Sequence, residues 1–344
     1  MTNAKTSCCV GRCAGAATAT GESASFVPRG DPVAFAWRRL PGGQFRMGTS
    51  RPGFEADGEG PVRTVTLSPF AIAAHTVTNA HFGDFVRETD YVTDAERLHW
   101  SFVFQAAVAP ALKRRIVNVP RETPWWYPVP HAYWAQPEGP GSTVVEGLHH
   151  PVVHVSWNDA KAYCGWSATR LPTEAEWEFA ARGGLDQATY PWGDELTPDG
   201  AHRCNIWQGD FPGRNTGEDG YAALAPVDAY LPNGYGLCNM VGNVWEWCEN
   251  YFVTGYPRET SAIDPVYDTP TSARSLRGGS FLCHASYCDR YRVAARSANT
   301  PDSSAGNIGF RVVTEAMPTA GGADPSRHPA GDPVSVKPGP AQIE

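Results

Sequence analysis

Residues 277–292 read RGGSFLCHASYCDRYR and form the least ordinary stretch of this 344-residue chain. Cys283 and Cys288 are five residues apart, so they cannot share one face of a helix, and in a strand they point to opposite faces. The two thiols can meet only across a turn, which the small or polar residues 284–286 permit. Thiols that meet can close a disulfide or hold a soft ion such as Cu(I).

Donors and positive charges follow the cysteine pair closely in sequence, at His284, Arg290, Arg292 and Arg296. If they are also near in space, they lower the pKa of a thiol and make it more reactive. The ordinary alternative is that both cysteines are small buried apolar residues. The spacing C-x4-C is by itself a weak metal signal, so the residues alone leave both interpretations open.

The composition around this stretch indicates short elements joined by structured loops. Hydrophobic residues make up 42% of the chain and charged residues 19%, with 35 glycines, 30 prolines and 12 tryptophans. A net charge of −8 argues against a nucleic-acid partner. We expect no membrane association, because no apolar run reaches the roughly 18 residues of a transmembrane helix. Met1–Gly30 has no apolar signal segment, so the expected location is the cytoplasm.

The aromatic-rich residues 35–314 predict one domain, between tails at 1–34 and 315–344 whose composition predicts disorder. Alternating residues predict strands at 45–48 and 62–67. Thr78-Asn79 and Asn158-Asp159 precede two expected helices. A third begins at Thr173, where Thr173 and Glu176 form a capping box, and stops at Gly183-Gly184. Turn residues predict short strands and long ordered loops after that point.

Several segments resemble, in order, those of the formylglycine-generating enzyme (sulfatase-modifying factor) family, bacterial type. The resemblance covers about residues 37–313 and rests on residues 43–48, 124–126, 154–160, 170–178, 242–247, 277–292, 294–304 and 309–311. It implies a single loop-rich α+β domain, a variant of the C-type lectin fold. Relatives without oxidase activity share several of these motifs, whereas the cysteine pair with Ser280, His284 and Tyr287 is typical of the oxidase branch.

The resemblance also implies a reaction. The family oxidises the cysteine of a C-x-P-x-R motif, in an unfolded or nascent sulfatase polypeptide, to formylglycine with O2 and a thiol reductant. Cys283 and Cys288 match the residues whose thiolates hold Cu(I), which captures the substrate thiol and activates oxygen. Ser280, Tyr287 and His284 match residues that line the pocket for oxygen and substrate. The family is usually monomeric.

Two departures from the family pattern are visible. Thr76 and Trp100 stand where vertebrate-type members carry carboxylates that pair with the substrate arginine, so this arginine contact is in doubt. Structural disulfides of the secreted members are missing: Cys164 has no cysteine partner near Val312, and neither Ala181 nor Val293 is a cysteine. The missing disulfides fit an intracellular protein.

Two loop regions match calcium sites of the family and offer the oxygen ligands that hard cations need. The first set comprises Asn205, Asp219 and the carbonyls of Ile206 and Tyr221; the second comprises Asn239, Glu246 and the carbonyls of Gly242 and Val244. Calcium here would be structural. Loops rich in Asn, Asp and Gly are more often ordinary turns, which remains the competing interpretation.

Two other functions compete with the copper oxidase. A lectin-like fold also serves non-catalytic binding modules, in which the two cysteines would be inert or disulfide-bonded. A sulfoxide-synthase relative needs a helical domain with iron-binding histidines, which this chain lacks. Cys204, Cys238 and Cys248 are expected to be buried thiols, because no spacing supports a zinc site. Cys8, Cys9 and Cys13 lie in the N-terminal tail, and no role for them is predicted.

Overall fold

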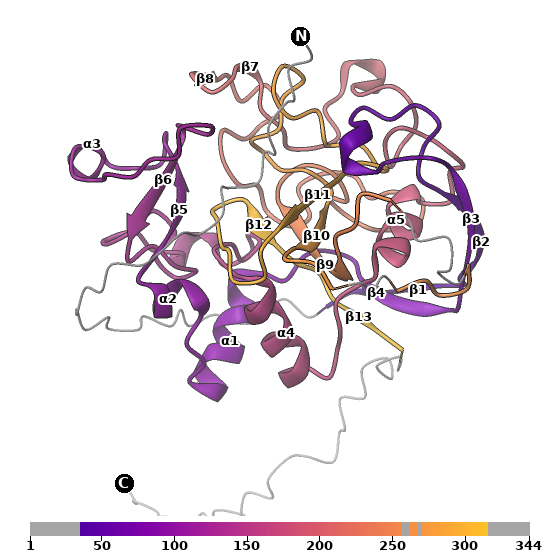
Figure 1. Cartoon of the computed structure of the whole chain (residues 1–344), viewed down its shortest axis with the longest axis horizontal. Coiled ribbons are helices and arrows are strands. Elements are labelled where there is room, and N and C mark those ends of the chain that lie inside the picture. Colours follow the sequence, from indigo (N-terminus) through magenta and orange to yellow (C-terminus); the bar gives the residue numbers. More distant parts are fainter. Residues whose placement is uncertain (1–34, 256–261, 267–269, 316–344) are drawn as a thin grey trace, which may run out of the picture.

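The computed structural model describes residues 35–255, 262–266 and 270–315. The predicted tails therefore lie outside the described residues except for Glu315, and so do Cys8, Cys9 and Cys13. Short strands and long ordered loops make up most of the described chain after Gly184, as the turn residues predicted. Figure 1 shows these loops above a layer of helices, with one mixed sheet between them.

A four-stranded sheet lies at the centre, in the order β11-β10-β9-β12. Its strands are β9 (Trp245–Tyr251), β10 (Arg274–Arg277), β11 (Arg296–Asn299) and β12 (Ile308–Gly309). β10 runs antiparallel to β9 and β11, whereas β12 is parallel to β9. The side chains of Trp245 and Trp247 are fully buried. The cysteine stretch begins where β10 ends, so a buried central strand positions it.

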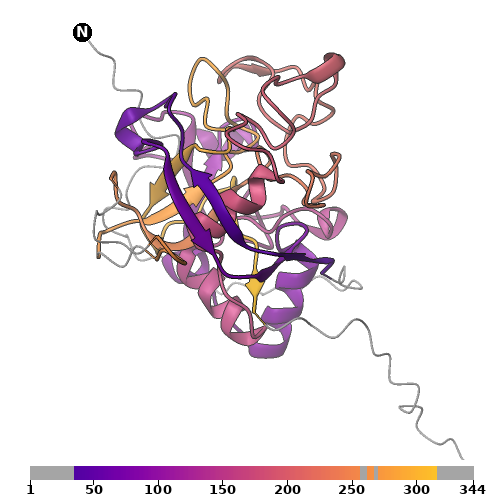
Figure 2. The same ribbon diagram turned by 90° about the vertical axis from the view of Figure 1, so that its right-hand side faces the viewer.

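The other strands form smaller sheets around this centre. β1 (Trp37–Leu40), β4 (Phe70–Ala73) and β13 (Val313–Thr314) join the two ends of the described domain. β2 (Gly43–Met47) pairs with β3 (Arg63–Leu67), which confirms the strands expected from alternation. Figure 2 shows this pair crossing one side of the molecule. The remaining pairs are β5 (Trp100–Phe104) with β6 (Trp126–Pro130) and β7 (Gly209–Asp210) with β8 (Arg214–Asn215).

Capping residues define the starts of the main helices. Thr78 caps α1 (Asn79–Thr89) and Thr173 caps α5 (Glu174–Arg182), both by the predicted side-chain acceptors. Further helices are α2 (Asp94–Leu98) and α3 (Pro110–Lys113), with single turns η1 (Glu55–Asp57), η2 (Val145–Gly147) and η3 (Pro198–Gly200). No helix among the described residues is long and apolar enough to cross a bilayer.

One helix start differs from the prediction by a residue or two. Asn158 and Asp159 lie inside the first turn of α4 (Trp157–Trp166), and Ser156 is its cap. The Ser156 hydroxyl accepts the amide of Asp159, while the Asp159 carboxylate accepts the amide of Ser156 at 2.8 Å. An aspartate three residues after the cap can thus complete the box that a glutamate usually completes.

Helix α5 packs against β9 and β10 (Figure 1), and it carries the ionised side chains of Glu174 and Glu178 into the interior. Glu174 binds Arg296 through two hydrogen bonds of 2.8 and 2.7 Å, and Glu178 binds both Arg182 and Arg277. Burial alone raises the pKa of Glu174 and Glu178, but the adjoining guanidinium groups outweigh burial and hold both pKa values below the ordinary range. Losing one partner of such a buried pair costs about 3–5 kcal/mol.

Candidate active site

The turn between β10 and β11 brings the two cysteines of the opening stretch together. The sulfur atoms of Cys283 and Cys288 lie 2.7 Å apart, neither residue is part of a disulfide, and both are at most 1% exposed. The amides of Tyr287 and Cys288 each donate to the carbonyl of His284 at 2.9 Å, which closes the turn. The convergence that the spacing required is therefore present, and the arrangement suits a disulfide or a shared soft metal ion.

Two glycines lead from β10 into this turn, and both adopt positive φ: Gly278 at +94° and Gly279 at +74°. A Cβ atom on Gly279 would lie 2.9 Å from the carbonyl oxygen of Arg290, on the far side of the turn. Only glycine combines this backbone conformation with so close an approach. The Gly-Gly pair thus allows the chain to leave a buried strand and fold back on itself.

Ser280 lies directly beside Cys283. It is fully buried, its backbone N–H lies 3.4 Å from the Cys283 sulfur, and its hydroxyl accepts a 3.0 Å hydrogen bond from the side chain of Asn307. Asn307 immediately precedes β12 and is itself buried. Sequence reasoning did not single out Asn307, because nothing local to it indicates a contact with a residue 27 positions away.

Tyr287 belongs to an aromatic wall next to the cysteines. Its ring stacks on Phe211 at 4.6 Å between centroids and meets the ring of Trp125 edge-on at 4.8 Å. Trp207 packs against Phe211, and its amide donates to the carbonyl of Cys283 at 3.0 Å. Phe211 and Trp207 were missed from the sequence, where they appear as ordinary loop aromatics. The wall gives the turn a rigid apolar side.

His284 lies at the partly exposed tip of the turn. Its Nδ1 atom is 2.8 Å from the hydroxyl of the exposed Ser286, and its carbonyl organises the turn. The structure thus brings Cys283, Cys288, Ser280 and Tyr287 close together, with the ring of His284 engaged at the outer end.

The arginines after the turn, which would lower the pKa of a nearby thiol, are paired with carboxylates. Arg290 donates to Asp57 at 2.6 Å, and Arg292 binds Glu59 through bonds of 2.9 and 2.7 Å. Burial raises the pKa of Asp57, Arg290 opposes this, and the charge of Cys288 adds to the increase. Asp57 is thus within electrostatic reach of the Cys288 sulfur, so the turn has carboxylates as well as guanidinium groups around it.

The first predicted calcium set lies in one loop cluster. The Asp219 carboxylate accepts the amides of Ile206 at 2.9 Å and Tyr221 at 3.1 Å, and burial raises its pKa. The side-chain oxygen of Asn205 is buried and has no hydrogen-bond partner among the described residues. A buried oxygen without a donor, close to a carboxylate, fits a bound cation. This cluster contacts the turn that carries Cys283 and Cys288. The backbone amide of Asn243 donates to the carbonyl of Asn205, and the carbonyl of Asn243 accepts the amide of Phe281.

The second predicted calcium set is less uniform. The side-chain oxygen of Asn239 is buried without a hydrogen-bond partner in the described part of the chain, as in the first set. Gly242 and Val244 lie in the loop that leads into β9. The Glu246 carboxylate, however, receives two bonds of 2.8 Å from Arg311 and one of 2.8 Å from Trp177. The guanidinium group of Arg311 therefore already balances the charge of Glu246.

The other described cysteines are ordinary thiols. Burial raises the pKa of Cys164 to about 12, and it also raises those of Cys204, Cys238 and Cys248. Within the described residues, no group of three or more His, Cys, Asp or Glu side chains could hold a metal. Cys204 and Cys248 are buried as expected, whereas Cys238, also expected to be buried, is partly exposed.

Thr76 and Trp100 occupy different surroundings. Thr76 is buried between β4 and α1, and its carbonyl is 2.9 Å from Nδ1 of His75. Trp100 opens β5 and meets Phe102 edge-on at 4.8 Å. Neither side chain carries a charge, so neither can form an ion pair with a substrate arginine.

This architecture and the paired cysteines define a class, the loop-rich α+β domains of the sulfatase-modifying type. Residues 35–316 match the family described as sulfatase-modifying factor enzyme 1-like domain. The formylglycine-generating enzyme of Thermomonospora curvata is 59% identical over 297 residues, which cover 85% of this chain and 98% of that protein. The inactive C-alpha-formylglycine-generating enzyme 2 of Bos taurus is 49% identical over 81% of this chain and 87% of its own length.

Among solved structures, PvdO from Pseudomonas aeruginosa resembles the chain with a TM-score of 0.60 at 22% identity, over 81% of this chain and 94% of PvdO. This likeness supports the predicted α+β variant of the C-type lectin fold. The chain belongs to the formylglycine-generating enzyme (sulfatase-modifying factor) family and is an enzyme of that type.

Proposed function

We propose that the chain is a copper-dependent, O2-using oxidase that converts the cysteine of C-x-P-x-R motifs in unfolded or nascent sulfatase polypeptides to formylglycine. One observation carries the proposal: two buried cysteine sulfurs that form no disulfide lie 2.7 Å apart, in a chain that is 59% identical to a formylglycine-generating enzyme. The overall change is balanced when a thiol reductant supplies two electrons and two protons. The thiol-bearing side chain of the substrate and O2 then give an aldehyde, hydrogen sulfide and water.

The donor set fits Cu(I). Soft thiolates select this ion, and Cys283 and Cys288 present two sulfurs that converge from one turn. When bound, the ion would supply an open coordination position for the substrate thiolate and an electron-rich centre for the reduction of oxygen. Burial of both sulfurs keeps bulk water away from them.

The surrounding residues position the reacting groups. Asn307 donates to the Ser280 hydroxyl, which leaves the hydroxyl hydrogen able to point toward a bound oxygen species. The rings of Phe211 and Trp125 fix the plane of Tyr287 beside the cysteines. We assign supporting roles to Ser280, Tyr287 and His284, with Ser280 nearest to the sulfur of Cys283.

Calcium is proposed as a structural ion. The first site, with Asn205, Asp219 and the carbonyls of Ile206 and Tyr221, is supported by the unpartnered Asn205 oxygen. At the second site the same argument supports Asn239 alone, with the carbonyls of Gly242 and Val244 as further candidates. Glu246 would have to serve a calcium ion and Arg311 together.

The test is a peptide assay. The protein is loaded with Cu(I) and incubated in air with a reductant and a peptide containing Leu-Cys-Thr-Pro-Ser-Arg, and the peptide mass is followed. We expect the mass loss of cysteine becoming formylglycine, absent in Cys283→Ala and Cys288→Ala and retained in Cys164→Ala. Unchanged turnover in either of the first two variants would refute the assignment of the sulfur pair.

A non-catalytic binding module is the second candidate, favoured by the 49% identity to a relative named inactive. The same assay separates the two, because a binding module with verified copper would leave the peptide mass unchanged. Should it do so, the first variants to examine are Thr76→Glu and Trp100→Asp, which restore carboxylates for the substrate arginine.

A further inference from the structure

A pocket of about 200 Å³ lies behind the cysteine turn and is lined by three arginines and by no acidic residue. Its walls come from three separate segments: residues 48–51 after β2, residues 187–189 after α5, and residues 292–294 before β11. Arg182, the last residue of α5, forms part of the pocket as well. Such a lining attracts a negative charge.

Arg182 is the central group of this pocket. Its side chain is 5% exposed, and it donates to Glu178 at 2.6 Å and to the carbonyl of Gly48 at 2.9 Å. Its Nη1 atom is buried and has no hydrogen-bond acceptor within the described residues. Glu178 also binds Arg277 at 2.5 Å, so one carboxylate is shared by two guanidinium groups. An unsatisfied buried donor is unfavourable, and an acceptor within its reach would relieve that cost.

The other two arginines frame the opening. Arg51 is exposed at the rim, while Arg292 is held by Glu59. The neighbouring exposed Asp194 already accepts the amide and hydroxyl of Thr189, at 2.9 and 2.8 Å. Asp194 also lies within electrostatic reach of Arg51, whose charge contributes to the lowered pKa of that carboxyl after the Thr189 hydrogen bonds.

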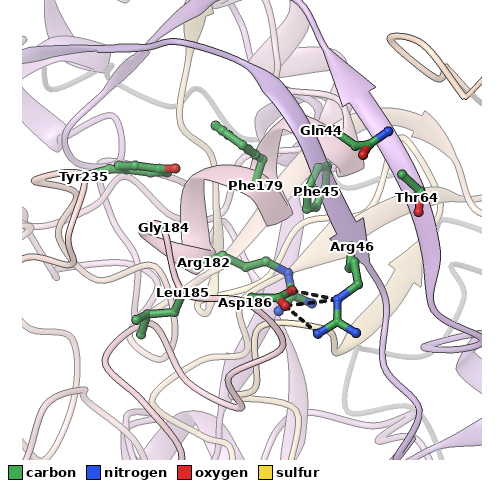
Figure 3. A pocket seen from close by; sticks show the side chains of 10 residues that line it. All are labelled: Gln44, Phe45, Arg46, Thr64, Phe179, Arg182, Gly184, Leu185, Asp186 and Tyr235. Atoms are coloured by element: carbon green, nitrogen blue, oxygen red, sulfur yellow. Dashed lines mark hydrogen bonds and ion pairs between the residues drawn. The ribbon is translucent and has the colours of Figure 1, made fainter.

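The adjacent pocket of about 430 Å³ provides a contrast, because it shares Arg182 but carries its own counterion (Figure 3). There Arg46 binds Asp186 through bonds of 2.9 and 3.1 Å, and the two side chains meet across its rim. A cation with a matching carboxylate in the same lining needs no further anion. The smaller pocket has no carboxylate in its lining, and Glu178 and Glu59 bind Arg182 and Arg292 from outside that lining.

We propose that the smaller pocket binds a small tetrahedral oxyanion, inorganic sulfate or phosphate, between Arg51 and Arg182. Planar guanidinium groups bind such anions through paired N–H donors, and the volume admits an ion of that size. Arg292 connects the pocket to the active turn, since its Nε donates to the carbonyl of Asp289 at 2.9 Å. A bound anion therefore stabilises the segment that directly follows Cys288.

Equilibrium dialysis with radiolabelled sulfate, at constant ionic strength set by chloride, tests the site on the full chain. We expect one saturable equivalent that unlabelled phosphate displaces. Arg51→Gln weakens binding by about tenfold, and Ala188→Glu, which places a carboxylate in the lining, abolishes it. Both positions are at least partly exposed, so both variants should fold, which thermal unfolding verifies.

Arg39→Gln, at an exposed arginine of β1 outside the pocket, is the matched control and should bind sulfate as the unaltered chain does. Absence of saturable binding to the unaltered chain overturns the proposal. So does binding that survives Ala188→Glu, or that Arg39→Gln weakens as much as Arg51→Gln, because either result would mean unspecific surface binding.

Discussion

The cysteine turn and helix α5 both adjoin β10, yet they are stabilised in different ways. The turn is held by backbone hydrogen bonds to His284, by two glycines and by an aromatic wall. Helix α5 is held by buried carboxylates that each bind a guanidinium from another part of the chain. Buried ion pairs thus stabilise helix α5. Backbone hydrogen bonds and aromatic rings, in contrast, position the sulfur pair. Changes in the two regions should therefore affect different properties.

The largest expected effect concerns activity and separates the two regions most sharply. Cys288→Ala should lower turnover of the C-x-P-x-R peptide by at least about a thousandfold, because a residue of the reacting centre is lost. Its free energy of unfolding should fall by only about 1 kcal/mol, because Cys288 is fully buried and the change leaves a small cavity. Cys248→Ala, in β9 beneath α5, should retain activity and lose about 1 kcal/mol of stability through the small cavity it leaves.

Peptide turnover and urea unfolding of both variants provide the measurement. If Cys248→Ala lost activity without unfolding, the contrast between the two regions would fail, because a residue beneath α5 would then take part in the chemistry.

The next effect concerns stability. Glu178→Gln should cost about 3–5 kcal/mol, because it leaves Arg182 and Arg277 buried beside a neutral amide. Glu176→Gln in the same helix is the matched control. Its partner Arg170 is 31% exposed, and a glutamine can still complete the capping box, so about 1 kcal/mol is expected. Equal losses in urea unfolding would show that burial of the pair is unimportant.

Calcium should stabilise the loop cluster that touches the turn through Asn243. At a calcium concentration of a hundred dissociation constants the gain is about 2.7 kcal/mol, and a chelator should remove it. Asp219→Asn should abolish this chelator-sensitive gain in thermal unfolding. Asp210→Asn, at an exposed residue of β7, should leave it intact. A chelator effect that survives Asp219→Asn would place the ion elsewhere.

The smallest effect is a dependence of stability on pH. The folded pKa values of Glu174 and Glu178 lie below the ordinary value, so the unfolded chain takes up protons first. Their contribution is complete above the ordinary glutamate pKa of about 4.3 and is lost as the pH falls through the folded values. Asp159 acts in the opposite sense, because burial raises its pKa to about 6 and its contribution declines as the pH rises toward that value.

Urea unfolding between pH 7 and pH 3 measures the sum of these contributions. Below the ordinary glutamate pKa, Glu178→Gln should flatten the dependence relative to the unaltered chain. An unchanged slope would mean that Glu178 is not ionised in the folded state.

Local features of the sequence predicted much of the fold. Alternation over residues 63–67, the capping box at Thr173 and the glycines at 278 and 279 each indicate their structure within a few residues. The spacing of five showed that Cys283 and Cys288 could meet only across a turn, but the family resemblance was needed to predict that they do meet. Resemblance to a family added the expected roles of the turn residues and the fold class.

Contacts between distant segments were beyond such reasoning. Asn307 reaches Ser280 because β12 pairs in parallel with β9. No local sequence pattern predicts which two strands pair in parallel. Glu246 appeared as a calcium ligand from its loop, yet Arg311, 65 residues away, binds it. Contacts between distant segments therefore decide whether a carboxylate binds an arginine or lysine of the protein or remains available to a metal ion.

The sequence by itself thus determined the turns and helix starts, because steric rules and short hydrogen bonds act over a few residues. Only the tertiary structure decided which charges are neutralised, which aromatic rings enclose Tyr287, and which donor of Arg182 is buried without an acceptor among the described residues. Electrostatic and packing energies depend on distance in space, and the chain brings together residues that are far apart in sequence.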